Sequence, residues 1–109
     1  MDADVTAQQV VKLLQEGDVQ LIDVRQQYEV DAGRIAGSRH IELAVLASHA
    51  DEIDRQRPTV FVCRSGARSA MATDAFRNAG FNAHNLAGGL LVWHAAGLPL
   101  EPADGYVAN

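Results

Sequence analysis

The segment Cys63-Arg64-Ser65-Gly66-Ala67-Arg68-Ser69 holds the residues of this chain that are best suited to chemistry. Cys63 is the only cysteine, which excludes an internal disulfide and a cysteine-rich zinc site. The thiolate is the nucleophilic form of cysteine, and both arginines and helix N-termini lower the pKa of a thiol. Because two arginines follow Cys63 closely and a helix is predicted next, we expect a nucleophilic thiolate at this position.

The other residues of this segment can all help to hold an anion at its centre. Gly66 allows a backbone geometry in which successive amide groups point at one place, forming an anion-binding nest. The residues predicted to bind the anion are Arg64, Ser65, Gly66, Ala67, Arg68 and Ser69. The simpler alternative is that Cys63 is an inert, buried thiol at a strand end. Such a thiol is not usually followed by two arginines, a glycine and a helix start, so we favour the nucleophile.

The elements around this segment place it at the end of a strand. Residues 59–62 follow Pro58 and are largely apolar, which is typical of a strand that is covered on both faces. Residues 69–79 are predicted to form a helix that ends at Gly80. Open α/β sheets bind ligands at the carboxyl ends of their strands, and a helix N-terminus carries a partial positive charge. Cys63 is therefore predicted to lie where both effects stabilise an anion.

The rest of the chain alternates between strand and helix patterns. We expect helices over residues 6–16, 26–32, 43–53 and 90–96, and strands over residues 19–24, within 35–41 and over 83–85. Thr6 and Gln9 form a capping-box pattern at the first helix, and Gly17 suits the left-handed position after it. This alternation predicts an α/β domain with a central, mostly parallel five-stranded sheet and helices on both faces.

Length, composition and charge restrict the class of protein. The 109 residues fit one domain, and 48% hydrophobic with 21% charged residues is ordinary for a soluble globular protein. We expect this domain over residues 1–102, followed by a poorly ordered tail over residues 103–109. The net charge of −5 argues against nucleic acid as a partner, because proteins that bind nucleic acid usually carry a basic surface.

No targeting or membrane segment is recognisable in the sequence. The start of the chain lacks the basic and apolar regions of a signal peptide. The longest apolar run, residues 87–93, is far shorter than the roughly 20 residues that span a bilayer. We therefore expect a cytoplasmic monomer with no membrane partner. The four histidines have no metal-ligand spacing, so we expect no metal site, and we also expect no cofactor.

Three stretches of the chain resemble the signatures of the single-domain rhodaneses, in the same order and over nearly the whole length. Residues 21–41, LIDVRQQYEVDAGRIAGSRHI, resemble the first signature, which begins with Asp-Val-Arg. Residues 63–72, CRSGARSAMA, resemble the active-site loop Cys-Arg-x-Gly-x-Arg-Ser. Residues 85–100, NLAGGLLVWHAAGLPL, resemble the closing signature with its Gly-Gly, Trp and Gly-Leu-Pro. The loop is the most specific of the three.

The resemblance implies a rhodanese-like fold and a thiosulfate sulfurtransferase activity. Cys63 would attack the outer sulfur of a small anionic donor such as thiosulfate, and the resulting persulfide would pass its sulfur to cyanide or to a thiol, including a protein thiol. The loop amides would cradle the persulfide. Asp23 and Arg25 match the Asp-Val-Arg of the first signature, and we expect them to support the fold and the active-site face.

The first signature departs from the common family pattern. Arg34 and Ala36 stand where His and Pro are common, and His40 and Glu42 stand where Asn and Pro often follow. The active-site loop is unaffected, so these changes cast no doubt on the nucleophile. Arg34 and Arg39 are expected near the rim of the pocket, which leaves the identity of the acceptor open.

Two other functions stay open at this point. Phosphatases and arsenate reductases on the same scaffold have a loop that resembles Cys-x5-Arg, with five residues between the two. In this chain only four residues separate Cys63 from Arg68. One residue adds roughly 3.3–3.6 Å of chain, so the shorter loop favours sulfur over phosphate. The other alternative is a non-catalytic module, or a carrier that passes persulfide between proteins. The presence of Cys63 argues against a non-catalytic module, because inactive members of the family that it resembles usually look as if they have lost this cysteine.

Overall fold

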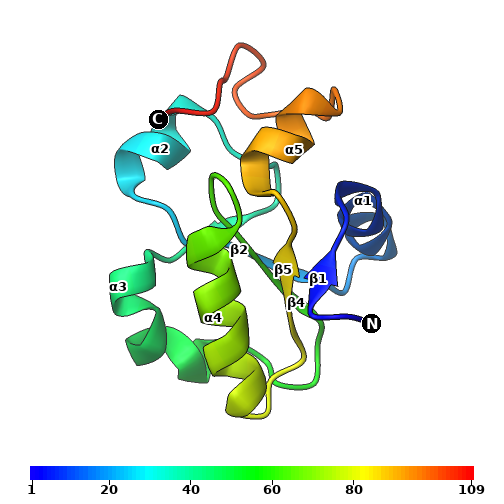
Figure 1. Cartoon of the computed structure of the whole chain (residues 1–109), viewed down its shortest axis with the longest axis vertical. Helices are drawn as coiled ribbons and strands as arrows, with labels where there is room; N and C mark the ends of the chain where they lie inside the picture. The colour runs from blue at the N-terminus through cyan, green and yellow to red at the C-terminus, as the bar shows by residue number, and fades with distance from the viewer.

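The computed structural model describes residues 1–109 and is built around a five-stranded sheet in which all neighbouring strands are parallel (Figure 1). The strands are β1 (Asp4–Val5), β2 (Gln20–Asp23), β3 (Arg39–His40), β4 (Thr59–Val62) and β5 (Ala83–Leu86), in the spatial order β1-β5-β4-β2-β3. The predicted α/β architecture is confirmed. Strand β1 was not located from the sequence, because two residues are too few to show an alternating pattern.

The helices cover both faces of this sheet. They are α1 (Ala7–Glu16), α2 (Gln27–Ala32), α3 (Leu43–Leu46), the 3₁₀ helix η1 (Ala47–Glu52), α4 (Ala67–Asn78) and α5 (Gly89–Ala95). In Figure 1, α3 and α4 lie on one side of the strands and α1 lies on the other. None of these helices has both the length and the apolar character that crossing a bilayer requires.

Strand β4 is the centre of the core, because its side chains are buried on both faces. Val60 and Val62 point into a cluster that includes α1 and α5, and Phe61 points into the other cluster with α4. Phe61 packs edge-on against Phe76 of α4, with ring centroids 5.0 Å apart. A fully buried side chain of this size contributes roughly 1.5–3 kcal/mol, so burial stabilises the strand that precedes Cys63.

The local signals at the first helix are confirmed in full. The Gln9 amide donates to Thr6 Oγ1 at 3.1 Å, and the Thr6 amide donates to Gln9 Oε1 at 2.8 Å, which completes the capping box. Gly17 ends the helix with φ of +83°, as its left-handed position requires.

The single helix predicted over residues 43–53 is wrong, because the structure divides this segment into α3 and η1. The sequence of η1, Ala-Ser-His-Ala-Asp-Glu, contains Ser, His and Asp, which are weak helix formers. Ser48 also donates its hydroxyl to the carbonyl of Val45 at 2.7 Å, a local bond that competes with regular helix geometry.

Residues 103–109 contact the helix α2 and the loop after β4. The Tyr106 amide donates to the carbonyl of Ala32 at 3.0 Å, and the absence of a side chain on Gly33 leaves room for the Tyr106 backbone. Arg64 donates to Asn109 Oδ1 at 2.7 Å. The poor order predicted for this tail stays a prediction, while its position places it beside the loop.

Candidate active site

The loop after β4 carries Cys63 at the carboxyl end of the central strand. Cys63 is 1% exposed, and Gly66 forms the N-cap of α4 with φ of +100°, a conformation that side chains rarely adopt. A Cβ at Gly66 would also lie 3.2 Å from the Gly88 amide nitrogen, a tight contact that favours glycine here as well. Helix α4 begins at Ala67, two residues earlier than predicted, and this brings its first amides close to the sulfur.

Three hydrogen-bond donors converge on Cys63 Sγ. The amides of Gly66 and Ser69 lie 3.1 and 3.4 Å from the sulfur, and the Ser69 hydroxyl oxygen lies 3.2 Å from it. Burial by itself would raise the pKa of the Cys63 thiol. The bonds from Ser69 and from the amides of Gly66 and Arg68 outweigh burial, so the pKa of Cys63 is lower than usual, in the direction that the sequence predicts.

The two arginines of the loop do not touch the sulfur with their side chains. Arg68 donates through Nη1 and Nη2 to the two carboxylate oxygens of Glu29, at 2.8 and 2.9 Å. Glu29 is buried on α2, and the bond from Arg68 lowers the pKa of its carboxyl. Arg64 donates to Asn109, and its Nε is buried without a partner. The side chains of both arginines stay predicted anion-binding groups, and the hydrogen bonds to Sγ come from neutral donors.

The remaining two residues of the loop, Ser65 and Ala67, make no hydrogen bond to Sγ. Ser65 and Ala67 are exposed, and the Ser65 hydroxyl makes no hydrogen bond. Ser65 precedes Gly66 in the turn after β4, and Ala67 follows it as the first residue of α4. The structure therefore gathers Cys63 and residues 64–69 into one loop, with Ser69 as the residue whose side chain contacts the sulfur.

Asp23 and Arg25 form a fully buried ion pair beneath this loop. Arg25 Nη2 donates to Asp23 Oδ2 at 2.7 Å and to the carbonyl of Gly33 at 2.8 Å, while Arg25 Nη1 donates to the carbonyl of Glu29 at 3.4 Å. The pair fastens α2 to the end of β2. The side chain of Glu29 in turn bonds to Arg68, so Asp23 and Arg25 are linked to the loop through α2, and their supporting role stays a prediction.

The start of α5 also shapes the loop, which the sequence analysis missed. Leu90 donates its amide to the carbonyl of Cys63 at 2.9 Å, and Leu91 donates its amide to the carbonyl of Arg64 at 3.0 Å. A Cβ at Gly89 would lie 2.5 Å from each of these two carbonyl oxygens. These bonds tie the first two carbonyls of the loop to the start of α5. The Gly-Gly of the closing signature was the signal in the sequence, but it does not show which carbonyls lie against it.

Arg34 and Arg39 are not part of the loop's hydrogen-bond network. Arg34 Nε lies 4.0 Å from Glu101 Oε2, and Arg39 pairs with Glu52. Neither side chain bonds to residues 63–69. No group of three or more His, Cys, Asp or Glu side chains is arranged to hold a metal ion.

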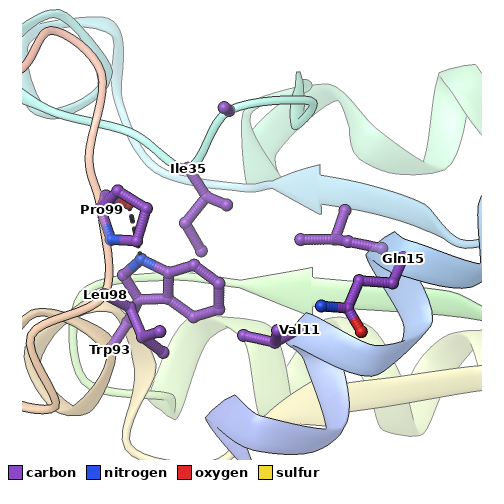
Figure 2. A pocket seen from close by; sticks show the side chains of 8 residues that line it. Val11, Gln15, Ile35, Trp93, Leu98 and Pro99 are labelled. Atoms are coloured by element: carbon purple, nitrogen blue, oxygen red, sulfur yellow. Dashed lines mark hydrogen bonds between the residues drawn. The ribbon is translucent and has the colours of Figure 1, made fainter.

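A separate apolar pocket of about 320 Å³ lies on the face of the sheet opposite α4, between α1 and the end of α5 (Figure 2). Trp93 forms one wall and donates its indole N–H to the carbonyl of Pro99 at 2.9 Å. Val11, Ile35 and Leu98 line the same pocket, which contains no charged side chain. Its lining therefore provides no positive charge for an anionic substrate.

Comparison with known proteins points to one family. The family model for the rhodanese-like domain matches residues 6–96. The HTH-type transcriptional regulator Rv0324 of Mycobacterium tuberculosis is 38% identical over 100 residues, which cover 89% of this chain and 44% of the regulator. The chain thus spans less than half of that relative. The thiosulfate sulfurtransferase GlpE of Pseudomonas aeruginosa is 33% identical over 99 residues, which cover 90% of this chain and 86% of GlpE.

The solved structures agree with these sequence matches. A rhodanese-related protein from Thermoplasma volcanium matches with a TM-score of 0.84 at 25% identity, covering 91% of this chain and 97% of its own. The parallel five-stranded sheet with helices on both faces is therefore a rhodanese-like fold, as the sequence resemblance predicts.

Proposed function

The chain belongs to the rhodanese-like domain family, and from this we propose that it is a sulfurtransferase that carries sulfane sulfur as a persulfide on Cys63. The proposed donor is a small sulfur anion, with thiosulfate as the prototype. The proposed acceptor is cyanide or a thiol, including a thiol on a protein. Relatives of similar identity include proteins named sulfurtransferases, which supports this class of reaction.

The observation that carries the proposal is the set of three donors around Cys63 Sγ, namely two amides and the Ser69 hydroxyl. These donors stabilise a negative charge on sulfur without a neighbouring general base. Because the amides belong to the first turn of α4 and to its cap, they are fixed before any substrate arrives. Groups that are already oriented toward the charge cost no reorganisation during the reaction.

In the first step, the Cys63 thiolate attacks the outer sulfur of thiosulfate. A bond forms between Sγ and this sulfur while the S–S bond of the donor breaks, and the electron pair of the broken bond leaves with sulfite. The negative charge of the persulfide then lies on the outer sulfur. We expect the loop amides of residues 64–69 to cradle it.

In the second step, the acceptor removes the outer sulfur. Cyanide attacks this sulfur, the bond to Sγ breaks, and its electron pair restores the Cys63 thiolate as thiocyanate leaves. A thiolate acceptor becomes a persulfide in the same way. Since the sulfur moves as a neutral atom, neither step needs an oxidant or a reductant.

Arg64 is the charged side chain that is best placed to recruit the anionic donor. The charge of Arg68 is balanced by Glu29, whereas Arg64 bonds to the neutral amide of Asn109. We propose that Arg64 exchanges this amide for the donor at the mouth of the loop.

The test is mass spectrometry of the intact protein after incubation with thiosulfate. We expect the protein to gain one sulfur atom, to lose it on addition of cyanide, and to lose the capacity in Cys63→Ser. A peptide map assigns the added sulfur to Cys63. A folded protein that gains no sulfur from thiosulfate, or from a polysulfide used as a second donor, would contradict the proposal.

The same preparation distinguishes the alternative functions. A carrier accepts sulfur but turns over slowly with thiosulfate and cyanide, so the comparison of loading with steady-state turnover separates a carrier from an enzyme. Hydrolysis of a phosphate ester that depends on Cys63 would instead favour a phosphatase. The loop with four residues between Cys63 and Arg68 favours sulfur transfer over this outcome.

We also propose that the protein acts in the cytoplasm as a monomer. A reducing compartment keeps thiols from forming disulfides, which a catalyst with a single reactive cysteine requires. Size-exclusion chromatography with light scattering measures the oligomeric state directly. A dimer linked through Cys63 in cell extracts would contradict the proposed location.

A further inference from the structure

The Ser69 hydroxyl lies between two atoms that can accept its proton. Ser69 Oγ is 3.2 Å from Cys63 Sγ and 2.5 Å from Asn85 Oδ1. A hydroxyl group has one proton to donate, so it cannot serve both acceptors at once. Ser69 is fully buried and Asn85 is 5% exposed, so water does not readily replace either partner.

Asp4 determines which end of the Asn85 amide faces Ser69. Asn85 Nδ2 donates to Asp4 Oδ1 at 3.1 Å across the pairing of β1 with β5. An ionised carboxylate can only accept, so the amide nitrogen must face Asp4 and the amide oxygen must face Ser69. If the amide were reversed, its nitrogen would donate to Ser69 and leave the hydroxyl proton for the sulfur. Asp4 therefore makes Asn85 a competitor of Cys63.

We propose that Asn85 is a positioning residue that accepts the Ser69 hydroxyl proton when Cys63 Sγ is uncharged and releases it to Sγ when the sulfur is a thiolate. The proton stays on Ser69 Oγ throughout, and only its direction changes. The inference rests on the proposed persulfide cycle, in which the charge on Sγ appears and disappears. In the free thiolate, Ser69 points to Sγ. In the persulfide the charge has moved to the outer sulfur, so Ser69 turns back to Asn85.

This arrangement makes a prediction that a purely structural role does not make. If Asn85 only held Ser69 in place, its removal would weaken the bond to Sγ and make the thiolate harder to form. If Asn85 competes for the proton, its removal leaves Sγ as the sole acceptor and makes the thiolate easier to form. The two roles therefore predict opposite signs for the shift in thiol ionisation.

The charged groups around Cys63 stay in place in this comparison. Arg68 of α4 is balanced by Glu29 of α2, Arg64 belongs to the loop, and the end of β2 contributes the buried Asp23–Arg25 pair. His40 of β3 bonds to the Arg25 carbonyl. The first turn of α5 contributes glycine and leucine residues without charge.

The test measures the rate of alkylation of Cys63 by iodoacetamide as a function of pH, which reports the fraction of thiolate without needing sulfur transfer. In Asn85→Leu, which has a similar volume and no acceptor, we expect the thiolate to form at lower pH than in the wild type. Below the midpoint this corresponds to an increase in rate of about 3- to 10-fold, the value of one hydrogen bond. Ser69→Ala shifts the midpoint to higher pH, and the double variant behaves like Ser69→Ala.

Two aspartates close to each other in the sequence give a matched pair of variants. Asp4→Ala releases the Asn85 amide and is expected to shift the midpoint to lower pH, by less than Asn85→Leu. Asp2→Ala removes the same charge from the same exposed segment but has no side-chain bond to Asn85, so we expect no shift. An equal shift in both aspartate variants would show that charge alone is responsible and would overturn the role of Asp4.

A midpoint that rises or stays unchanged in Asn85→Leu would overturn the proposal. Circular dichroism and urea unfolding establish that the variant is folded, and Asn85→Ala takes its place if the leucine variant is not. The outcome is independent of the proposed function. A wild-type protein that accepts no sulfur but shows the expected shift would contradict sulfur transfer while retaining the competition for Ser69.

Discussion

The polar groups beneath the loop are charged, whereas those that donate to the sulfur are neutral. Beneath the loop, Asp23 pairs with Arg25 and Glu29 pairs with Arg68, so full charges are satisfied by each other. At Cys63 Sγ the donors are amides and a hydroxyl. The difference separates two tasks, since the ion pairs fix where the loop lies and the neutral donors stabilise charge on the sulfur.

The largest effect is expected from breaking the buried pair beneath the loop. Arg25→Met leaves the Asp23 carboxylate buried without its partner, which costs about 3–5 kcal/mol of unfolding free energy. Urea unfolding measures this loss. The rate of Cys63 alkylation in the folded protein should change far less, because Arg25 donates nothing to the sulfur.

The double variant Asp23→Leu/Arg25→Met is the control for that experiment. It removes both charges together, so it should be more stable than Arg25→Met alone. If Arg25→Met unfolds at nearly the wild-type urea concentration, the buried pair does not stabilise the region beneath the loop. That result would contradict the role that we give to the ion pairs.

A smaller effect is expected from filling the space between the loop and α5. Gly89→Ala places a Cβ 2.5 Å from the carbonyl oxygens of Cys63 and Arg64 at a residue with positive φ. Strain and overpacking together are expected to cost about 2–4 kcal/mol. Because the carbonyls must move, the amides on the same loop move too, and we expect slower sulfur loading as well as lower stability.

Gly97→Ala is the matched control, because Gly97 also has a positive φ but its Cβ would meet nothing within 4 Å. It should lose about 1–2 kcal/mol from backbone strain alone and keep the wild-type loading rate. Equal loading rates for the two variants would show that the contact with α5 does not shape the loop.

Removing the charge of Glu29 tests its ion pair with Arg68, which is the more exposed of the two pairs. Glu29→Gln weakens the paired bonds to Arg68, which is partly exposed, so we expect a loss of about 1–2 kcal/mol at neutral pH. The pKa of Glu29 is lowered in the folded protein, so its contribution is complete above the unfolded pKa and is lost as the pH falls through the folded value.

The wild type should therefore lose more stability on acidification than Glu29→Gln, and the two stabilities should converge at low pH. Urea unfolding at a series of pH values measures the difference. A difference that stays constant down to the lowest pH would show that the carboxylate charge of Glu29 contributes nothing to stability.

The smallest effect is expected from Arg64, the one loop side chain that we assign to the donor. Arg64→Met should raise the KM for thiosulfate about 5-fold, the value of roughly one exposed ion pair, with kcat nearly unchanged. The alkylation rate with neutral iodoacetamide should match the wild type, because the guanidinium does not contact Sγ. A large fall in kcat would place Arg64 with the groups that act on the sulfur.

The parts of this site that are local in sequence could be predicted, and those that depend on distant partners could not. The apolar strand before Cys63 and the glycine at position 66 indicate a strand, a loop and a helix without any other part of the chain. The pairing of Arg68 with Glu29 depends on where α2 lies, and neither residue carries a signal for the other. Two arginines close to a cysteine therefore suggested direct contact with the sulfur, whereas in the folded chain Arg68 pairs with Glu29.

Asn85 and the amides of α5 were missed for a related reason. Asn85 lies in β5 and reaches Ser69 because β5 pairs with β4, the strand that leads into the Cys63 loop and α4. In the sequence it is a polar residue within a short strand, which is unremarkable by itself. The three family signatures include all of these residues, but a signature does not state which residues touch each other.

The bonds from α5 to the carbonyls of Cys63 and Arg64 have one practical consequence. The amide protons of Leu90 and Leu91 are held only while the loop keeps its shape, so their exchange with deuterium follows the opening of the loop. The NMR signals of these two amides can therefore report how often the loop around Cys63 opens, without a label on the cysteine and without any substrate.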